Sequence, residues 1–397
     1  MRYKPPSSWQ KLAFKDVAEV ITGSTPSTKE PENYGEYLPF VTPGELDLGE
    51  PIIHAETSLS LVGKAKARTV PKDSVLVCCI GSLGKVGITG REVAFNQQIN
   101  ALVFNEKLVC PRYGYHYCRT LKPLLSHMAP STTVAIVNKS RFQSLEIPFP
   151  PLEEQRRIAA ILDKADGVRR KRKEAIRLTE ELLKSTFLEM FGDPVTNPKG
   201  WEVIGLGKIS QIQGGLQVTP ARKELPLEVP YLRVANVYRD KLLLDEIKNI
   251  RVTSSELERI NMKAGDILIV EGHGNKEEIG RSSVWDGSIE NCVHQNHLIR
   301  VRLDPNKAEP IYISAYLNSA GGRCQLTKFG KTTSGLNTIS TSNVKATKVL
   351  CPPIEMQKRY LDFQRKLTEA KNASVQHLEQ SENLFNSLLQ RAFRGEL

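Results

Sequence analysis

The side chains best able to do chemistry in this 397-residue chain are hydrogen-bonding groups in loops, several of them rich in glycine. Arg and Lys can pair with guanine, and Asn and Gln with adenine, which is how proteins read base edges in DNA. An ordinary role in a loop is the alternative for any one of these residues. Their clustering at matching places in the two halves of the chain favours DNA contact. The candidate DNA contacts are Ser24, Thr25, Ser82, Lys85, Asn96, Gln97, Lys139 and Arg141 in the first half, and Gln213, Gln217, Arg222, Arg233, Asn236, His273, Asn275, Arg281, His294, Gln295, Lys331 and Asn337 in the second.

Two glycine-rich loops could suggest a nucleotide site. "GSLGKVG" at 81–87 lacks the G-x-x-x-x-G-K-[ST] spacing that cradles phosphates, so a plain turn between strands is favoured. "EGHGNKEEIG" at 271–280 has no βαβ context and is equally weak as a nucleotide site. Neither loop predicts a bound nucleotide.

Metal and catalytic chemistry find little support in the sequence. His294 and His297, with His273 and Cys292 nearby, lack the second close-spaced ligand pair that a zinc site wants. No Ser-His-Asp arrangement, paired-acid motif or methyltransferase motif can be assembled. The chain is therefore predicted to bind rather than to catalyse, with no catalytic residue and no metal.

Length and composition limit the class of protein. A chain this long predicts two or three domains, and its formal charge of +11 favours a polyanionic partner, nucleic acid before membrane. The longest apolar runs, such as 74–80, are too short to cross a bilayer, and the N-terminus has no apolar signal core. Seven cysteines without regular spacing fit reduced thiols in a cytoplasm.

The landmarks of residues 1–150 recur in the same order in residues 193–351. Each half is predicted to be a mixed α/β domain of short β-branched strands with about one helix. The matching segments are 6–23 with 198–215, 70–88 with 262–280, 95–104 with 293–302, 112–128 with 310–326, and 131–142 with 331–344. The pair 95–104 and 293–302 aligns Asn96-Gln97 with His294-Gln295. The pair 112–128 and 310–326 is expected to be helical.

A long helix is predicted after each of two proline motifs, "PPLEEQ" at 150–155 and "PPIEMQ" at 352–357. Apolar residues recur at steps of three and four through 152–191 and 354–397, which defines a stripe along a helix. Two independent helices would leave both stripes without a partner, so an antiparallel coiled coil is favoured. About 40 residues would give a spacer of roughly 60 Å and relate the halves by a pseudo-twofold axis.

A basic run, "RRKRK" at 169–173, lies in the first of these helices. A solvated helix face is the simpler interpretation. Contact with DNA phosphates, or with an acidic partner surface, is the alternative.

The combination of the two-fold repeat, "PPLEEQRRIAAILDKAD" with "PPIEMQKRYLDF", and the terminal "LLQRAFRGEL" resembles the specificity (S) subunits of type I restriction-modification systems. The resemblance covers essentially the whole chain. The second motif departs from the first at two positions: Met356 stands in place of Glu154, and Tyr360 in place of Ile158. The second motif is therefore the looser match.

The resemblance implies an α+β fold: two target recognition domains (1–150 and 193–351) in a pseudo-twofold arrangement, separated by two conserved spacer helices (151–192 and 352–397). Each recognition domain would read one part of a split sequence in double-stranded DNA. The helices would dock two methyltransferase subunits, which bind S-adenosylmethionine and methylate adenine N6. Restriction subunits that use ATP and Mg would then join, while the S subunit itself would hold no cofactor and catalyse nothing.

The residues alone leave two other classes of function open. One is a protein–protein scaffold built on the coiled coil, without sequence reading. The other is an unrecognised enzyme, such as a nuclease.

Overall fold

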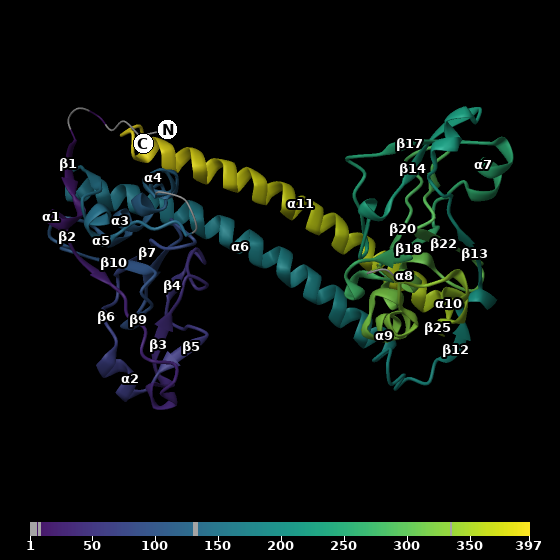
Figure 1. The fold of residues 1–397 in the computed structure, drawn as a ribbon, viewed down its shortest axis with the longest axis horizontal. Coiled ribbons are helices and arrows are strands. Elements are labelled where there is room, and N and C mark those ends of the chain that lie inside the picture. The colour runs from purple at the N-terminus through teal and green to yellow at the C-terminus, as the bar shows by residue number, and fades with distance from the viewer. Residues whose placement is uncertain (1–5, 7–8, 130–133, 334–335) are drawn as a thin grey trace. The chain divides into compact units, whose positions relative to one another are not determined.

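The computed structural model describes residues 6, 9–129, 134–333 and 336–397, with the side chains of 331–333 left out. The chain divides into two compact units, Met1–Ile176 with Ala373–Leu397, and Arg177–Asn372. The two long helices are α6 (Leu152–Phe191) and α11 (Ile354–Ala392). Each unit therefore contains one globular part and one end of both helices, whereas the sequence prediction treated the helices as separate segments. Figure 1 shows the units and the helices.

Two sheets form the globular part of the first unit. The larger has the strand order β2 (Ala18–Thr22), β10 (Ile99–Phe104), β7 (Val75–Cys78), β8 (Val86–Thr89) and β4 (Pro51–Ile52). The smaller has the order β5 (Thr57–Leu59), β3 (Tyr34–Val41), β9 (Val93–Phe95) and β6 (Thr69–Val70). A two-stranded ribbon joins β1 (Gln10–Ala13) to β11 (Glu146–Phe149). The helices are α1 (Phe14–Val17), α2 (Leu61–Lys66), α3 (Pro111–Cys118), α4 (Lys122–Met128) and α5 (Lys139–Gln143).

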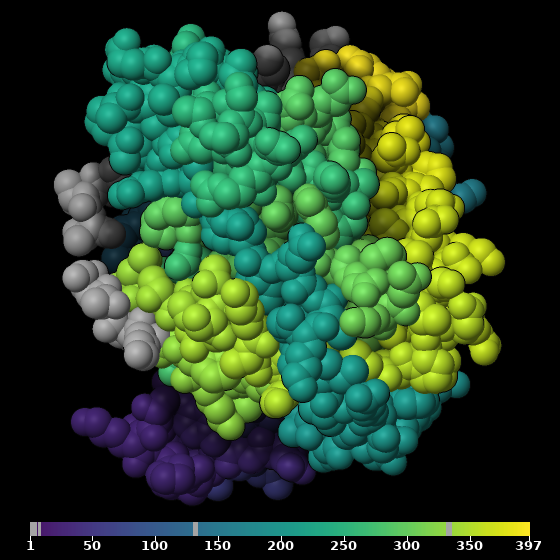
Figure 2. Space-filling model, turned by 90° about the vertical axis from the view of Figure 1, so that its right-hand side faces the viewer, coloured from purple at the N-terminus to yellow at the C-terminus, as the bar shows by residue number. Residues whose placement is uncertain are grey.

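The second unit repeats this plan. Its larger sheet has the order β13 (Ser210–Gly214), β22 (Leu298–Leu303), β18 (Ile267–Val270) and β20 (Ser282–Val284), and its smaller sheet β17 (Lys248–Val252), β14 (Leu227–Leu232) and β21 (Val293–His294). The remaining strands are β12 (Glu202–Gly205) with β25 (Lys348–Cys351), β15 (Val237–Tyr238) with β16 (Lys241–Leu242), and β19 (Gly272–His273) with β24 (Leu336–Thr338) and β23 (Lys331–Thr333). The helices are α7 (Ser254–Ile260), α8 (Pro310–Asn318), α9 (Ala320–Phe329) and α10 (Thr341–Ala346). Figure 2 shows the surface of this unit in teal and green.

The helices expected at 112–128 and 310–326 are each broken into two, as α3 and α4, and as α8 and α9. Pro123 lies in the first turn of α4, the one place where its missing N–H costs nothing, so a new helix begins there. Ser319 has extended backbone angles and ends α8 before α9 starts. The expectation of about one helix per half was therefore too low, while the predicted α+β class is confirmed.

Both faces of the central strand β7 are covered. Val75 and Val77 belong to one core cluster, whereas Leu76 and Cys78 belong to another on the opposite face. Such a strand reads as a continuous apolar run because neither face meets water. No described helix is long and apolar enough to cross a membrane.

The long helices pack antiparallel within each unit. In the first unit Lys173 pairs with Glu382 at 2.9 Å, and the guanidinium of Arg169 lies 4.9 Å from the ring centroid of Phe385. In the second unit Lys371 pairs with Glu180 at 2.7 Å, and further along α6 the ring centroids of Phe187 and Tyr360 are 5.6 Å apart. Higher numbers in α6 meet lower numbers in α11 in both units, so the two helices run in opposite directions.

Candidate nucleic-acid interface

Four loops of the first unit meet at one end of its sheets; together they form what we call the four-loop surface (residues 23–25, 80–82, 96–98 and 134–136). The backbone N–H of Ser24 donates to the Phe95 carbonyl at 3.0 Å, next to the third loop. The N–H of Gly81 donates to the Ala135 carbonyl at 2.9 Å. The side chain of Thr25 donates to Gln97, which joins the first loop to the third. The loops thus present several polar side chains on a hydrogen-bonded frame.

The second unit builds an equivalent four-loop surface from residues 215–217, 272–275, 295–297 and 336–337. The N–H of Leu216 donates to the His294 carbonyl at 2.9 Å, as Ser24 does to Phe95. His273 pairs with Asn337 across the strands β19 and β24. The Nδ2 of Asn337 donates to the Gly274 carbonyl at 3.1 Å. Two glycine-rich hairpins therefore close the same arrangement of loops in both units.

The repeated glycine at the entrance of each surface has a steric reason. A Cβ on Gly23 would lie 2.1 Å from the carbonyl oxygen of Asn96, and one on Gly215 would lie 2.3 Å from that of Gln295. Such distances exclude any larger residue, because the loop backbones touch at this point.

The register of the repeat corrects one alignment. Val41 pairs with Phe95 in parallel strands of the first unit, and Leu232 pairs with His294 in those of the second. His294 is therefore the counterpart of Phe95, and Gln295-Asn296 is the counterpart of Asn96-Gln97. A slip of one residue in a strand moves every side chain to the opposite face. The sequence alignment, which matched His294 to Asn96, was wrong by that one residue.

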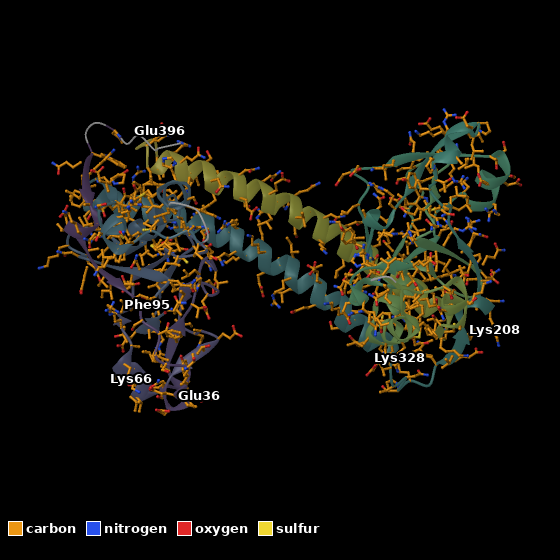
Figure 3. The ribbon with its side chains drawn as sticks, in the orientation of Figure 1. Glu36, Lys66, Phe95, Lys208, Lys328 and Glu396 are labelled. Atoms are coloured by element: carbon orange, nitrogen blue, oxygen red, sulfur yellow. The ribbon has the colours of Figure 1, made fainter. Side chains whose placement is uncertain are left out.

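His294 is a core residue, so its predicted base contact is wrong. Its side chain is 0% exposed, and its Nδ1 lies 3.1 Å from the Leu298 carbonyl. Burial, and then the charge of Arg300, lowers the pKa of His294 to about 4. It therefore carries no charge at neutral pH. Its counterpart Phe95, labelled in Figure 3, is equally buried.

Asn236 and Arg281 are also buried, so both predicted base contacts are wrong. Asn236 closes a turn: its Oδ1 accepts from the N–H of Arg233 at 2.9 Å and its Nδ2 donates to the Leu243 carbonyl at 2.8 Å. The guanidinium of Arg281 pairs with Glu278 at 2.8 Å and donates to the Val234 carbonyl at 3.1 Å. Both side chains stabilise loops and leave no accessible donor pair for a base.

The other predicted residues differ in exposure. The exposed ones are Thr25, Ser82, Gln97, Lys139, Arg141, Gln217 and Asn275. The half-buried ones are Ser24, Lys85, Asn96, Gln213, Arg222, Arg233, His273, Gln295 and Asn337. The side chain of Lys331 lies outside the described residues. The contact of each remaining residue with DNA stays a prediction.

The structure brings ten of the predicted residues together on the two four-loop surfaces. These are Ser24, Thr25, Ser82, Asn96 and Gln97 in the first unit, and Gln217, His273, Asn275, Gln295 and Asn337 in the second. Lys139 and Arg141 lie on α5, and Gln213 lies in β13. Lys85 donates to the Pro43 carbonyl at 3.2 Å, outside the four loops.

Arg222 and Arg233 also lie outside the four loops and have structural partners. Arg222 forms a two-pronged pair with Glu256 at 3.0 and 3.1 Å, and Arg233 pairs with Glu246 at 3.2 Å. A guanidinium held by a carboxylate has fewer donors left for DNA. These two side chains are weaker candidates than the exposed residues of the four loops.

Sequence reasoning missed several side chains on these surfaces. Val134 and Ile136 are 54% and 45% exposed, and Ile136 forms an isolated bridge with Ile80. The sequence pattern pointed to hydrogen-bonding groups, although apolar side chains also recognise the methyl group of thymine. Asn296 was missed because of the alignment slip.

The basic run at 169–173 separates into two kinds of residue. Arg169 and Arg170 face the carboxylate of Asp166, which is 1% exposed, at 2.6 and 3.3 Å. Lys171 and Lys173 are exposed, and Lys173 pairs with Glu382. The two arginines are therefore structural, which neither sequence interpretation anticipated.

Metal and thiol chemistry find no cluster here. Within the described residues, no group of three or more His, Cys, Asp or Glu could hold a metal ion. Burial raises the pKa of Cys79 and of Cys292 to about 12, so both thiols stay protonated at neutral pH.

Comparisons with known proteins agree with this geometry. A family described as "Type I restriction modification DNA specificity domain" matches residues 6–178 and 198–381, so the chain belongs to this family. Its role is that of the specificity subunit of a type I restriction-modification system.

Two relatives and one solved structure illustrate the similarity. The chain is 24% identical to the type I restriction enzyme StySPI specificity subunit of Salmonella potsdam, covering 100% of this chain and 90% of the relative. It is 25% identical to the EcoKI specificity subunit of Escherichia coli K12, covering 99% and 90%. The crystal structure of an S subunit from M. genitalium shares the fold, with a TM-score of 0.60 at 14% identity and coverage of 99% and 98%.

Proposed function

We propose that each unit reads one part of a split DNA sequence through its four-loop surface. The observation that carries this proposal is that the same four loops meet in both units and present different side chains. Thr25, Ser82 and Gln97 are exposed in the first unit, and Gln217 and Asn275 in the second. Amide and hydroxyl groups of this kind distinguish base pairs in the major groove. Because the side chains differ, the two parts of the recognised sequence differ as well.

Phosphate contacts supply the rest of the affinity. The formal charge of +11 favours a polyanion, and each phosphate neutralised by Lys or Arg makes binding weaker as salt rises. Lys139 and Arg141 are exposed on α5, which is the helix that follows the fourth loop in the chain. They are suited to hold the DNA backbone beside the bases.

The long helices dock the partner subunits in this proposal. Both helices carry apolar side chains that are 43–58% exposed. These are Val168, Val375 and Leu384 in the first unit, and Leu178, Leu182 and Leu188 in the second. Apolar residues left uncovered on helices whose other faces are packed are typical of protein interfaces. We propose two methyltransferase subunits as the occupants, followed by restriction subunits.

The chemistry belongs to those partners. S-adenosylmethionine, ATP and Mg would be held by the methyltransferase and restriction subunits, with methylation at adenine N6. This chain would supply recognition and spacing without catalysis, in the cytoplasm where the DNA is.

Binding measurements with the assembled methyltransferase complex test the proposal. The complex should bind one gapped sequence far more tightly than scrambled DNA, and the affinity should fall steeply between low and physiological salt. Equal affinity for all sequences would favour the scaffold alternative. Methylation or cleavage of DNA by the isolated chain would show that it is an enzyme.

A further inference from the structure

Two carboxylates, the half-buried Asp163 and the buried Asp166, join α6 to the globular part of the first unit. The carboxylate of Asp163 lies 3.0 and 3.1 Å from Nε of Arg112, and 2.7 Å from Nε2 of His116, which is 0% exposed. One turn further along α6, Asp166 pairs with Arg119 at 3.2 Å and with Arg170 at 3.3 Å. We call these six residues the charge clamp.

The charge clamp also reaches two other elements of the same unit. Arg170 forms an ion pair with Glu50, in the loop before β4. The guanidinium of Arg119 lies 4.5 Å from the ring centroid of Phe385 on α11. The charge clamp therefore connects four elements: α3 with the residue that follows it, the loop before β4, α6 and α11.

The second unit has no such clamp at the equivalent place. Cys110 and Glu309 are the N-caps of α3 and α8, and their N–H groups donate to Gln155 and Gln357. This match makes Ile311, Ala315 and Asn318 the counterparts of Arg112, His116 and Arg119, and Arg365 and Thr368 the counterparts of Asp163 and Asp166.

A groove of about 330 Å³, open to solvent, lies where the clamp would be, and Ile311, Arg365 and Thr368 line it. Asn318 makes its hydrogen bonds elsewhere, to Asp240 at 2.8 Å and to the Ser282 carbonyl at 2.9 Å. The residues of α8 and α11 therefore border an open groove at this point, whereas their counterparts in the first unit are joined by ion pairs.

Stability alone does not explain the clamp. Taking charges out of water is costly, and apolar packing of similar volume is often as stable. The second unit is built without these ion pairs. What charge-assisted, two-pronged hydrogen bonds add is a fixed relative orientation of the groups that they join.

We propose that the charge clamp is a positioning device that sets the orientation of the first recognition domain on α6, and with it the length of the gap in the DNA sequence. The second domain, which has an open groove and no ion pairs at the equivalent residues, is the one that adjusts to the DNA. This inference rests on the proposed function, because it assigns the spacing of the two half-sites to particular residues.

The test measures methylation by the assembled complex on DNA with the preferred gap and with gaps one base pair longer or shorter. For Asp166→Asn we expect the preference for the correct gap to fall by about ten-fold, the size of one mismatched base pair, with the same bases recognised. Thr368→Ala, at the equivalent position of the second unit, is the matched control and should leave the preference unchanged. A folded Asp166→Asn complex with wild-type gap preference would overturn the inference, and so would an equal loss for Thr368→Ala.

A second variant covers the case in which Asp166→Asn does not fold. The side chain of Glu50 is 72% exposed, so Glu50→Gln removes only the outermost contact. A partial loss of gap preference supports the clamp, and wild-type preference for this variant contradicts it. Failure of the proposed function would look different, since the wild-type complex itself would then show no preferred sequence.

Discussion

Gln155 and Gln357 make equivalent hydrogen bonds in the two units. The Oε1 of Gln155 accepts from the Cys110 N–H at 2.9 Å, and that of Gln357 accepts from the Glu309 N–H at the same distance. Their Nε2 atoms donate to the carbonyls of Pro150 and Pro352 at 3.0 and 2.8 Å. Both side chains are 0% exposed. Each glutamine thus fastens the start of a long helix to the preceding domain.

The first prediction concerns this fastening. Gln155→Ala leaves the Cys110 N–H and two carbonyls buried without a partner, and should lower the unfolding free energy by about 2–4 kcal/mol. Thermal unfolding of the full chain measures the effect. Glu153→Ala is the control, because that side chain is 88% exposed and should matter by less than about 0.5 kcal/mol. Equal effects for the two variants would contradict the role of Gln155.

The second prediction concerns His294 and pH. Its pKa is about 4 in the folded chain against 6.5 in the unfolded one, so the unfolded chain binds more protons between these values. Stability should therefore be full above about pH 6.5 and fall by up to about 3 kcal/mol as pH drops towards 4. Burial lowers the pKa of His116 as well, which adds to the same trend.

His294→Phe separates the two histidines, because Phe95 fills the equivalent position in the first unit. Unfolding curves between pH 4 and 7 should show a weaker pH dependence for this variant, with DNA recognition retained. If His294→Phe altered the recognised bases, His294 would be a base contact after all.

The third prediction concerns Gln97, exposed on the first four-loop surface. Gln97→Ala should relax one base of the first half-site, at a cost of about 1–3 kcal/mol in discrimination. Competition binding of the complex to single-base variants of its site measures this. Asn296→Ala, the counterpart on the second unit, should change only the other half-site. A uniform loss over all sequences would indicate a phosphate contact instead.

The fourth prediction concerns the spacer. Inserting four residues into the exposed middle of α6 adds about 6 Å along the helix, close to two base-pair steps. The complex should then prefer a longer gap while reading the same two half-sites. A gap that did not change would show that α6 does not set the spacing.

Much of the fold could be predicted because the spacing of apolar residues along the chain reveals both the repeat and the two long helices. The loop candidates were harder to judge, since burial depends on register. His294 and Gln97 look equally polar in sequence, yet one is in the core and the other faces solvent. The partners of the basic run could not be foreseen either, because Arg170 meets Glu50 across 120 residues of chain.

Sequencing of adenine methylation in a host that carries the complete system tests the central claim most directly. The account predicts a single motif with two different half-sites and a fixed gap, and loss of the motif when this chain is deleted. Methylation at a continuous motif, or an unchanged motif after an exchange of the second unit for that of a relative, would contradict it.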